Sequence, residues 1–128
     1  MIGYNHITLL GNLTRDPELK YLASGSAVCS FPLAVNRTYK QGGEKKEETT
    51  YVDIVVFGRQ GEHCGQYLHK GEGCIVDGRL QQRRWETEDG QKRSKHEVVA
   101  QSVTFLPKKG RGEAPESSDD YDPTAGEG

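Results

Sequence analysis

The sequence predicts an all-β fold, in which five strands form a small barrel with one short helix between strands 3 and 4. Three observations support this class. Runs rich in β-branched and aromatic residues alternate with turn signals over residues 1–107. Helical periodicity occurs once, after the third run. Residues 108–128 are rich in Gly, acidic residues, Ser and Pro, so we expect one domain over residues 1–107 and a disordered acidic tail over 108–128.

The first three strands are bounded by turn residues. The first ends at Thr14-Arg15-Asp16-Pro17, the second is entered through Ser24-Gly25-Ser26, and a polar loop over Lys40–Lys46 precedes the third. The expected strands are His6–Leu13, Ala27–Tyr39 and Thr49–Phe57.

The remaining elements are a helix and a hairpin. Glu62–Lys70 places Cys64, Tyr67 and Leu68 at helical spacing before Gly71 stops the helix. The last two strands, joined by a tight turn at Asp89-Gly90, are Cys74–Thr87 and Lys92–Leu106. Three strands, a helix and a hairpin are the order of the oligonucleotide-binding (OB) Greek-key barrel. A five-stranded sandwich is the competing architecture, and the position of the helix favours the barrel.

Alternation along two strands separates a core face from a binding face, because successive side chains point to opposite sides. The core set is expected to be Val52, Ile54, Val56, Cys74, Val76 and Leu80. The opposite faces carry Tyr51, Asp53, Val55 and Phe57 in strand 3, and Ile75, Asp77, Arg79, Gln81, Arg83 and Trp85 in strand 4. Unpaired bases stack on aromatic rings and phosphates attract cations, so this face predicts a nucleic-acid site.

Candidate residues follow from this face. Tyr51, Phe57 and Trp85 are the expected stacking residues. Tyr39 is ambiguous, because alternation groups it with core residues unless its strand runs past the barrel or is bulged near Pro32. The candidate phosphate ligands are Arg37, Lys40, Arg59, Arg79, Arg83, Arg84, Lys92 and Arg93, with Lys95 following across the turn.

Charge is divided unevenly along the chain. Seventeen basic and 13 acidic residues give positions 1–112 a net charge of +4, whereas six acids give positions 113–128 a charge of −6. A basic body predicts a polyanionic partner, and the acidic tail is expected to compete with that partner at low salt. An ordinary domain with a solubilising tail would show the same division.

Other functions lack their motifs. The four His and three Cys match no paired zinc spacing, and a Cys64/His69 dyad lacks an orienting acid, so we expect no metal, no cofactor and no catalysis. Asp53 and Asp77 lack the third ligand of a nuclease site. An odd cysteine count, no secretory signal and no apolar span predict a reducing, cytoplasmic location.

Several motifs resemble those of bacterial single-stranded DNA-binding proteins, over about residues 4 to 107. They are Gly11–Tyr21 (GNLTRDPELKY), Phe31–Arg37 (FPLAVNR), Val56–Arg59 (VFGR), Tyr67–Gly71 (YLHKG), Asp77–Leu80 (DGRL) and Glu97–Ala100 (EVVA). The resemblance implies an OB fold, a homotetramer, and a cytoplasmic, nucleoid-associated role in replication, recombination and repair. It also implies that Tyr39, Tyr51, Phe57 and Trp85 stack bases.

The resemblance further implies partner binding through an acidic C-terminus, here Asp119, Asp120 and Asp122. The family motif closes with Pro-Phe, whereas this chain ends Asp122-Pro123-Thr124-Ala125-Gly126-Glu127-Gly128, so we expect only weak, salt-sensitive contacts with replication and repair proteins. Two alternatives stay open. An RNA-binding OB protein would use the same stacking platforms, and a replication-restart adaptor would mainly hold proteins.

Overall fold

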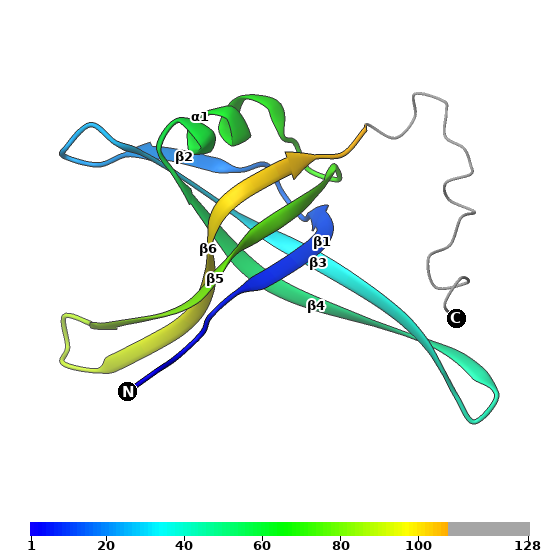
Figure 1. Ribbon diagram of the computed structural model, residues 1–128. Coiled ribbons are helices and arrows are strands. Elements are labelled where there is room, and N and C mark those ends of the chain that lie inside the picture. The colour runs from blue at the N-terminus through cyan, green and yellow to red at the C-terminus, as the bar shows by residue number, and fades with distance from the viewer. Residues whose placement is uncertain (108–128) are drawn as a thin grey trace.

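The computed structural model describes residues 1–107. The expected tail, with Asp119, Asp120 and Asp122, lies outside the described residues. Seven elements follow one another along the chain (Figure 1): β1 (Ile7–Leu13), β2 (Glu18–Tyr21), β3 (Ala27–Gln41), β4 (Glu44–Phe57), α1 (Gly58–Tyr67), β5 (Gly73–Glu86) and β6 (Lys92–Phe105).

Five of the strands close on themselves into the predicted barrel. The order along the sheet is β1-β5-β6-β4-β3-β2, and a second pairing of β1 with β3 completes the ring. β1 pairs with β5 over Ile7–Asn12 and reaches β3 through Asn12 and Leu13. Gly11 lies at this crossing, where a Cβ atom would stand 2.4 Å from the carbonyl oxygen of Ala34. Only glycine allows so close an approach of two backbones.

The barrel interior is filled by alternate residues of each strand. Ile54 and Val56 of β4 and Cys74 and Val76 of β5 are fully buried, as predicted from alternation. The largest fully buried side chains are Phe31, Leu33, Ile54, Leu68, Val56, Val76, Val98, Cys29, Cys64 and Cys74.

A β-bulge in β6 ties the helix to the barrel. Asp77 faces Ser102 and Gly78 faces Ala100, so Gln101 has no partner in β5. The side chain of Gln60 in α1 bonds this irregular backbone twice: its amide donates to the Gln101 carbonyl at 3.1 Å and its oxygen accepts from the Val103 amide at 2.7 Å. The helix therefore satisfies polar groups that the bulge frees.

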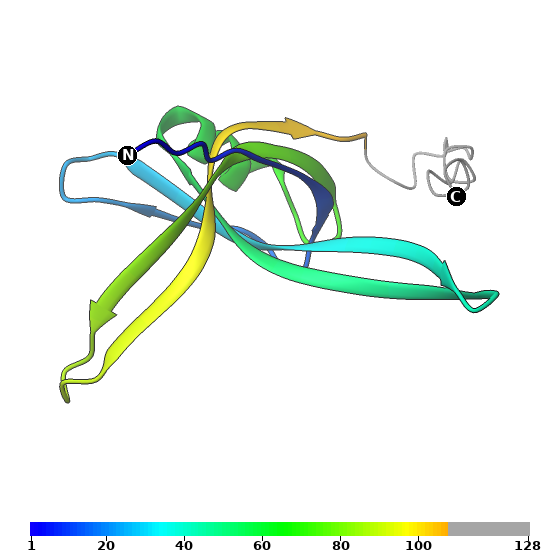
Figure 2. The ribbon, with the colours of Figure 1, turned by 60° about the horizontal axis from the view of Figure 1, so that its bottom comes forward.

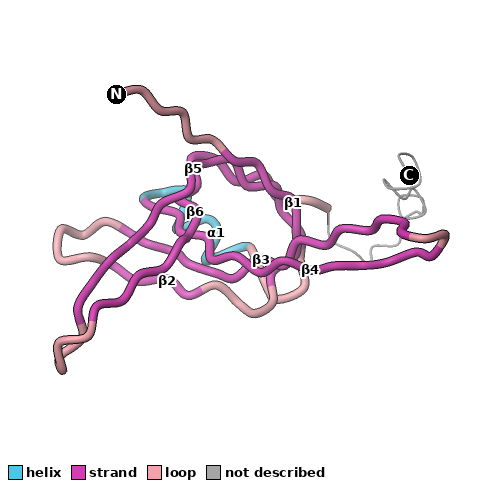
Figure 3. The backbone as a smooth tube through the Cα atoms, turned by 90° about the horizontal axis from the view of Figure 1, so that it is seen from below, coloured by secondary structure: helices cyan, strands magenta, loops and turns pink. Residues whose placement is uncertain are grey.

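Two hairpins continue beyond the barrel as long arms that diverge from each other (Figures 1 and 2). The β3–β4 arm keeps continuous register from Val28↔Phe57 to Gln41↔Glu44 and turns at Gly42 and Gly43, both with positive φ. The β5–β6 arm reaches Glu86↔Lys92 and turns around Gly90, whose amide donates to the Thr87 carbonyl at 2.9 Å. Seen from below, both arms stand clear of the ring of strands (Figure 3).

Four details of the predicted elements are wrong. β2 was not expected, and Lys40–Lys46 is no loop, because two glycines with positive φ turn the chain in two residues and both strands continue to them. Leu80, expected in the core, is 43% exposed because β5 leaves the barrel there. The helix itself begins at Gly58, four residues earlier than Glu62.

Within residues 1–107, no helix is long and apolar enough to cross a membrane.

Candidate nucleic-acid interface

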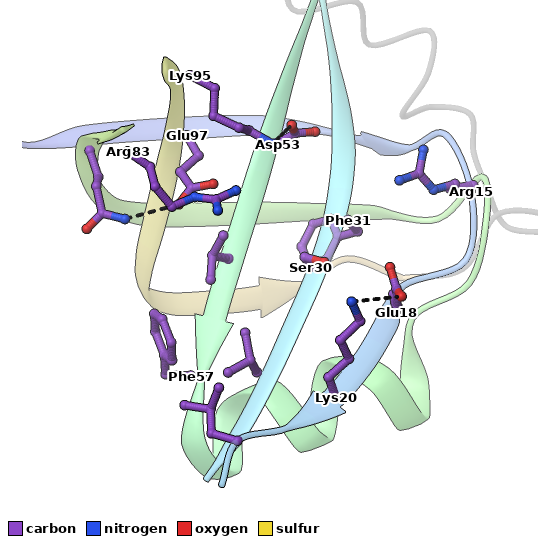
Figure 4. A pocket seen from close by; sticks show the side chains of 14 residues that line it. Arg15, Glu18, Lys20, Ser30, Phe31, Asp53, Phe57, Arg83, Lys95 and Glu97 are labelled. Carbon is purple, nitrogen blue, oxygen red and sulfur yellow. Dashed lines mark hydrogen bonds and ion pairs between the residues drawn. The ribbon is translucent and has the colours of Figure 1, made fainter. Parts of the chain in front are cut away.

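A groove of about 570 Å³ crosses the outer faces of β2, β3, β4, β6 and β5. Its lining combines apolar, polar and charged side chains (Figure 4): Arg15, Glu18, Lys20, Leu22, Val28, Ser30, Phe31, Asp53, Val55, Phe57, Gln81, Arg83, Lys95 and Glu97. We call this surface the groove.

The groove contains much of the binding face predicted from alternation. Asp53, Val55 and Phe57 of β4 line it together, while Ile54 and Val56 between them point into the core. Phe57, at the end of β4, is 48% exposed and offers its ring to the groove (Figure 4). An exposed ring on a barrel face is free to stack on a base.

Two further aromatics lie outside the groove. Tyr51 is 69% exposed and lies two residues before Asp53, so both side chains are on the same side of β4. Tyr39 lies on the β3–β4 arm, where the register is free of shifts, so the arm reaches Tyr39 by extension and not by a bulge. Alternation places Tyr39 and Tyr51 on opposite faces of this arm, since Tyr51 pairs with Ala34, five residues from Tyr39.

The β5–β6 arm carries a second hollow, of about 540 Å³. It brings together four of the predicted residues, Arg84, Trp85, Lys92 and Arg93, with Glu86 and Ser94. Trp85 is 42% exposed, and the Arg83 guanidinium lies 5.0 Å from its ring centre. This arrangement would let a base stack on the Trp85 ring while the surrounding cations bind the phosphates on either side of that base.

The other predicted cations are dispersed. Arg37 and Lys40 lie on the β3–β4 arm, where Arg37 contacts Glu48 at 3.0 Å and lies 4.6 Å from the Tyr39 ring centre. Arg59 is exposed on α1, and Arg79 is exposed on β5; neither lines the groove or the second hollow.

Asp77 does not join Asp53 in the groove. It accepts a hydrogen bond from the Thr8 hydroxyl at 2.6 Å, beside β1. The reason is that β5 leaves the barrel after Gly78: its first half packs beside β1, whereas Gln81 and Arg83 reach the groove.

Three groove cations are held by carboxylates. Lys95 contacts Asp53 at 2.7 Å, Lys20 contacts Glu18 at 3.4 Å, and the Arg83 Nε lies 3.5 Å from Glu97. The Glu97 carboxylate, almost fully buried, also accepts from the Gln81 amide at 3.0 Å. Most charged side chains of the groove are therefore paired, and its cationic residues only slightly outnumber its acidic residues.

Sequence reasoning missed Arg15 and Lys20 as groove residues. Arg15 lies in the turn between β1 and β2, and β2, a four-residue strand, brings Lys20 beside Val28 of β3. The available signal was the charged–apolar–charged alternation of Glu18, Leu19 and Lys20 after Pro17.

The cysteines are unsuited to nucleophilic chemistry. Burial raises the pKa of Cys64 to about 12, and those of Cys29 and Cys74 to about 11. At neutral pH these groups are thiols, whereas thiolate is the nucleophile. Within residues 1–107, no group of three or more His, Cys, Asp or Glu could hold a metal ion.

Comparison with known proteins gives consistent results. Residues 4–106 match the model of the single-strand binding protein family. A single-stranded DNA-binding protein of Wolinella succinogenes is 45% identical, over 92% of this chain and 74% of its own length. One of Treponema pallidum is 51% identical, over 83% of this chain and 60% of its own. The structure described as the Plasmodium falciparum SSB complex with ssDNA matches with a TM-score of 0.74 and 29% identity, covering 84% of this chain and 98% of that one.

Proposed function

The chain belongs to the single-strand binding protein family, and from this premise we propose that it binds single-stranded DNA without sequence preference. It is a binding protein and not an enzyme. It serves DNA replication, recombination and repair by covering exposed strands.

The main observation that supports this function is that exposed aromatic rings and cations occur together across the groove and the two arms. Tyr51, Phe57 and Trp85 are 69%, 48% and 42% exposed. Every base has a flat face, so stacking on such rings does not select a sequence and contributes roughly 1–3 kcal/mol per base. Duplex DNA keeps its base faces stacked internally and cannot use these rings.

We assign the strand a path from the β3–β4 arm, across the groove, to the second hollow on the β5–β6 arm. Tyr51, Phe57 and Trp85 stack bases along this path, and Tyr39 meets the strand where it passes around the arm edge. The phosphate ligands are Arg37, Lys40, Arg59, Arg79, Arg83, Arg84, Lys92 and Arg93. Counterion release from these cations would make the affinity depend steeply on salt.

We also infer a homotetramer, because one barrel per chain covers only about 4–16 nucleotides. The outer face of β1 and its neighbours in the sheet is the expected contact. Leu10, 55% exposed in β1, lies opposite Ile75 of β5 and would be covered there. In the cell we place the protein in the cytoplasm, on the nucleoid, with replication and repair proteins as neighbours.

Matched oligomers test this function. Affinities for a dT oligomer, a mixed-sequence DNA oligomer of equal length, its RNA counterpart and its duplex should be measured at the same stated salt. We expect similar binding of the two DNA strands and much weaker binding of the duplex. Equal or tighter binding of RNA would favour the RNA-binding alternative, in which contacts to the 2′-hydroxyl decide.

A further inference from the structure

Most cations of the groove already have a carboxylate partner in the free protein. Of its four cationic residues, Lys20, Arg83 and Lys95 each form an ion pair, whereas Arg15 forms none within residues 1–107. Binding a strand here therefore requires phosphates to compete with side chains and not only with salt ions.

The central pairs differ in how firmly the carboxylate is held. The Glu97 side chain is 5% exposed, accepts a hydrogen bond from the Gln81 amide and forms an ion pair with Arg83, so it is held within the sheet. The Asp53 side chain is 45% exposed, and within the described part of the chain its recorded partner is Lys95, which is itself 34% exposed. Water reaches the Asp53–Lys95 pair, and exposed ion pairs of this kind are easily exchanged.

The Asp53–Lys95 pair also occupies a sensitive position. It joins β4 to β6 across the groove (Figure 4), at 2.7 Å, the shortest ion pair of residues 1–107. Asp53 is on the same face of β4 as Phe57, with Val55 between them. Asp53 and Phe57 lie about 13 Å apart along an extended strand, so a DNA strand that stacks a base on Phe57 and continues along β4 would bring a neighbouring phosphate to this pair.

We propose that Asp53 sets the affinity of the groove for DNA. Its carboxylate mimics a phosphate by pairing with Lys95 until a DNA phosphate displaces it. The inference rests on the proposed function, since it needs a strand in the groove. A carboxylate and a phosphodiester each carry one negative charge and accept hydrogen bonds from an ammonium group. The exchange leaves the Lys95 ammonium paired in both states.

Two consequences follow from this exchange. Pairing Lys95 with a phosphate releases a cation condensed on the DNA, but the displaced Asp53 carboxylate takes up a salt cation in its place, so this contact adds little to the salt dependence of binding. The displaced Asp53 carboxylate then repels the phosphate backbone. Asp53 therefore weakens binding and flattens its salt dependence, which helps the strand to be released and passed on.

The test compares full-length wild-type protein with Asp53→Asn, Lys95→Gln and the double variant, each titrated with a dT oligomer at several salt concentrations. Asp53→Asn should bind roughly 2- to 10-fold more tightly at low salt. Its plot of log affinity against log salt should steepen by about 0.7, the contribution of one phosphate contact to a single strand. Compared with Lys95→Gln, the double variant should gain much less affinity and its salt plot should not steepen, because there is no ammonium group to unmask.

Glu62→Gln is the matched control. It changes the net charge equally, but the Glu62 carboxylate accepts from the Tyr21 hydroxyl at 3.2 Å and does not line the groove. Its affinity should stay near wild type. Circular dichroism establishes that each variant is folded, and Asp53→Ser replaces Asp53→Asn if the latter is not.

The outcomes separate the two claims. If wild-type protein does not bind the oligomer, the proposed function fails. If wild type binds but Asp53→Asn binds no more tightly than Glu62→Gln, or if the double variant keeps the gain, Asp53 does not mask Lys95 and this inference is overturned.

Discussion

At the scale of single residues, exposure distinguishes the rings that we assign to DNA binding from the ring that fills the core. Phe31 is 2% exposed and fills the barrel, whereas Tyr51 and Phe57 on the neighbouring strand remain in water. Leaving large apolar rings exposed forgoes the free energy of burying them, roughly 1.5–3 kcal/mol for a side chain such as Phe. The stacking role that we propose for these rings would account for their exposure.

Replacing Tyr51 or Phe57 by Ala should weaken binding of a dT oligomer by roughly 1–3 kcal/mol each, because each loses one stacked base. The thermal midpoint should change little, since both rings are largely exposed. Tyr67→Ala is the control: this tyrosine is equally exposed, at 58%, but lies at the end of α1 outside the groove. Equal losses for all three variants would reject the assigned path.

The three buried thiols predict a defined response to alkali. Their pKa values are raised from 9.0 to about 11 or 12 by burial, so the unfolded chain loses these protons first. This stabilisation is fully present below about pH 9 and is lost as pH rises toward 11–12. Urea titrations should show the free energy of unfolding falling over this range, and falling less steeply in Cys64→Ala.

Thiol labelling is a second test of the burial of the same three cysteines. An aromatic disulfide reagent should leave all three cysteines of the native protein unmodified at neutral pH and modify them after unfolding. Immediate modification of the native protein would contradict their burial.

At the scale of elements, the β5–β6 hairpin depends on the nearly buried carboxylate of Glu97, which also lines the groove. Glu97 joins Arg83 and Gln81 of β5 to β6. Glu97→Ala should reduce the free energy of unfolding by about 1–3 kcal/mol, because it removes a nearly buried carboxylate that accepts a hydrogen bond from Gln81 and pairs with Arg83. Glu48→Ala removes the exposed partner of Arg37 and should cost at most about 1 kcal/mol. Thermal or urea unfolding measures both, and equal losses would show that burial of Glu97 does not matter.

Most elements could be predicted from periodicity and turn residues, but long arms could not. Alternation correctly assigned Ile54, Val56, Cys74 and Val76 to the core. It failed at Leu80, because alternation continues along a strand that has already left the barrel and has nothing to pack against. The start of α1 was missed because Phe57 provides no side-chain cap and the helix begins with Gly58.

Residues of the candidate site could be predicted where they lie along one strand, but contacts between side chains of different strands could not. Phe57 and Trp85 could be found from alternation along single strands. The Asp53–Lys95 contact depends on the parallel pairing of β4 with β6, two segments about 40 residues apart, and no local pattern indicates which residues face each other there.

At the scale of the whole molecule, one barrel with two diverging arms presents more binding surface than one groove. A strand that follows both arms must bend around the barrel, and further copies extend the path. Light scattering at micromolar concentration should therefore give four times the chain mass of 14.2 kDa. A monomer mass would remove the basis for wrapping.

The fluorescence of Trp85 tests the central claim most directly. It is the single Trp of the chain and lies half-exposed in the hollow of the β5–β6 arm, so its emission reports on that arm alone. Titration with poly(dT) should quench the emission to a plateau, and salt should reverse the quenching as counterions compete for the cations. Unchanged Trp85 emission while an independent assay shows the DNA fully bound would mean that the strand does not cross this arm, and would contradict the account.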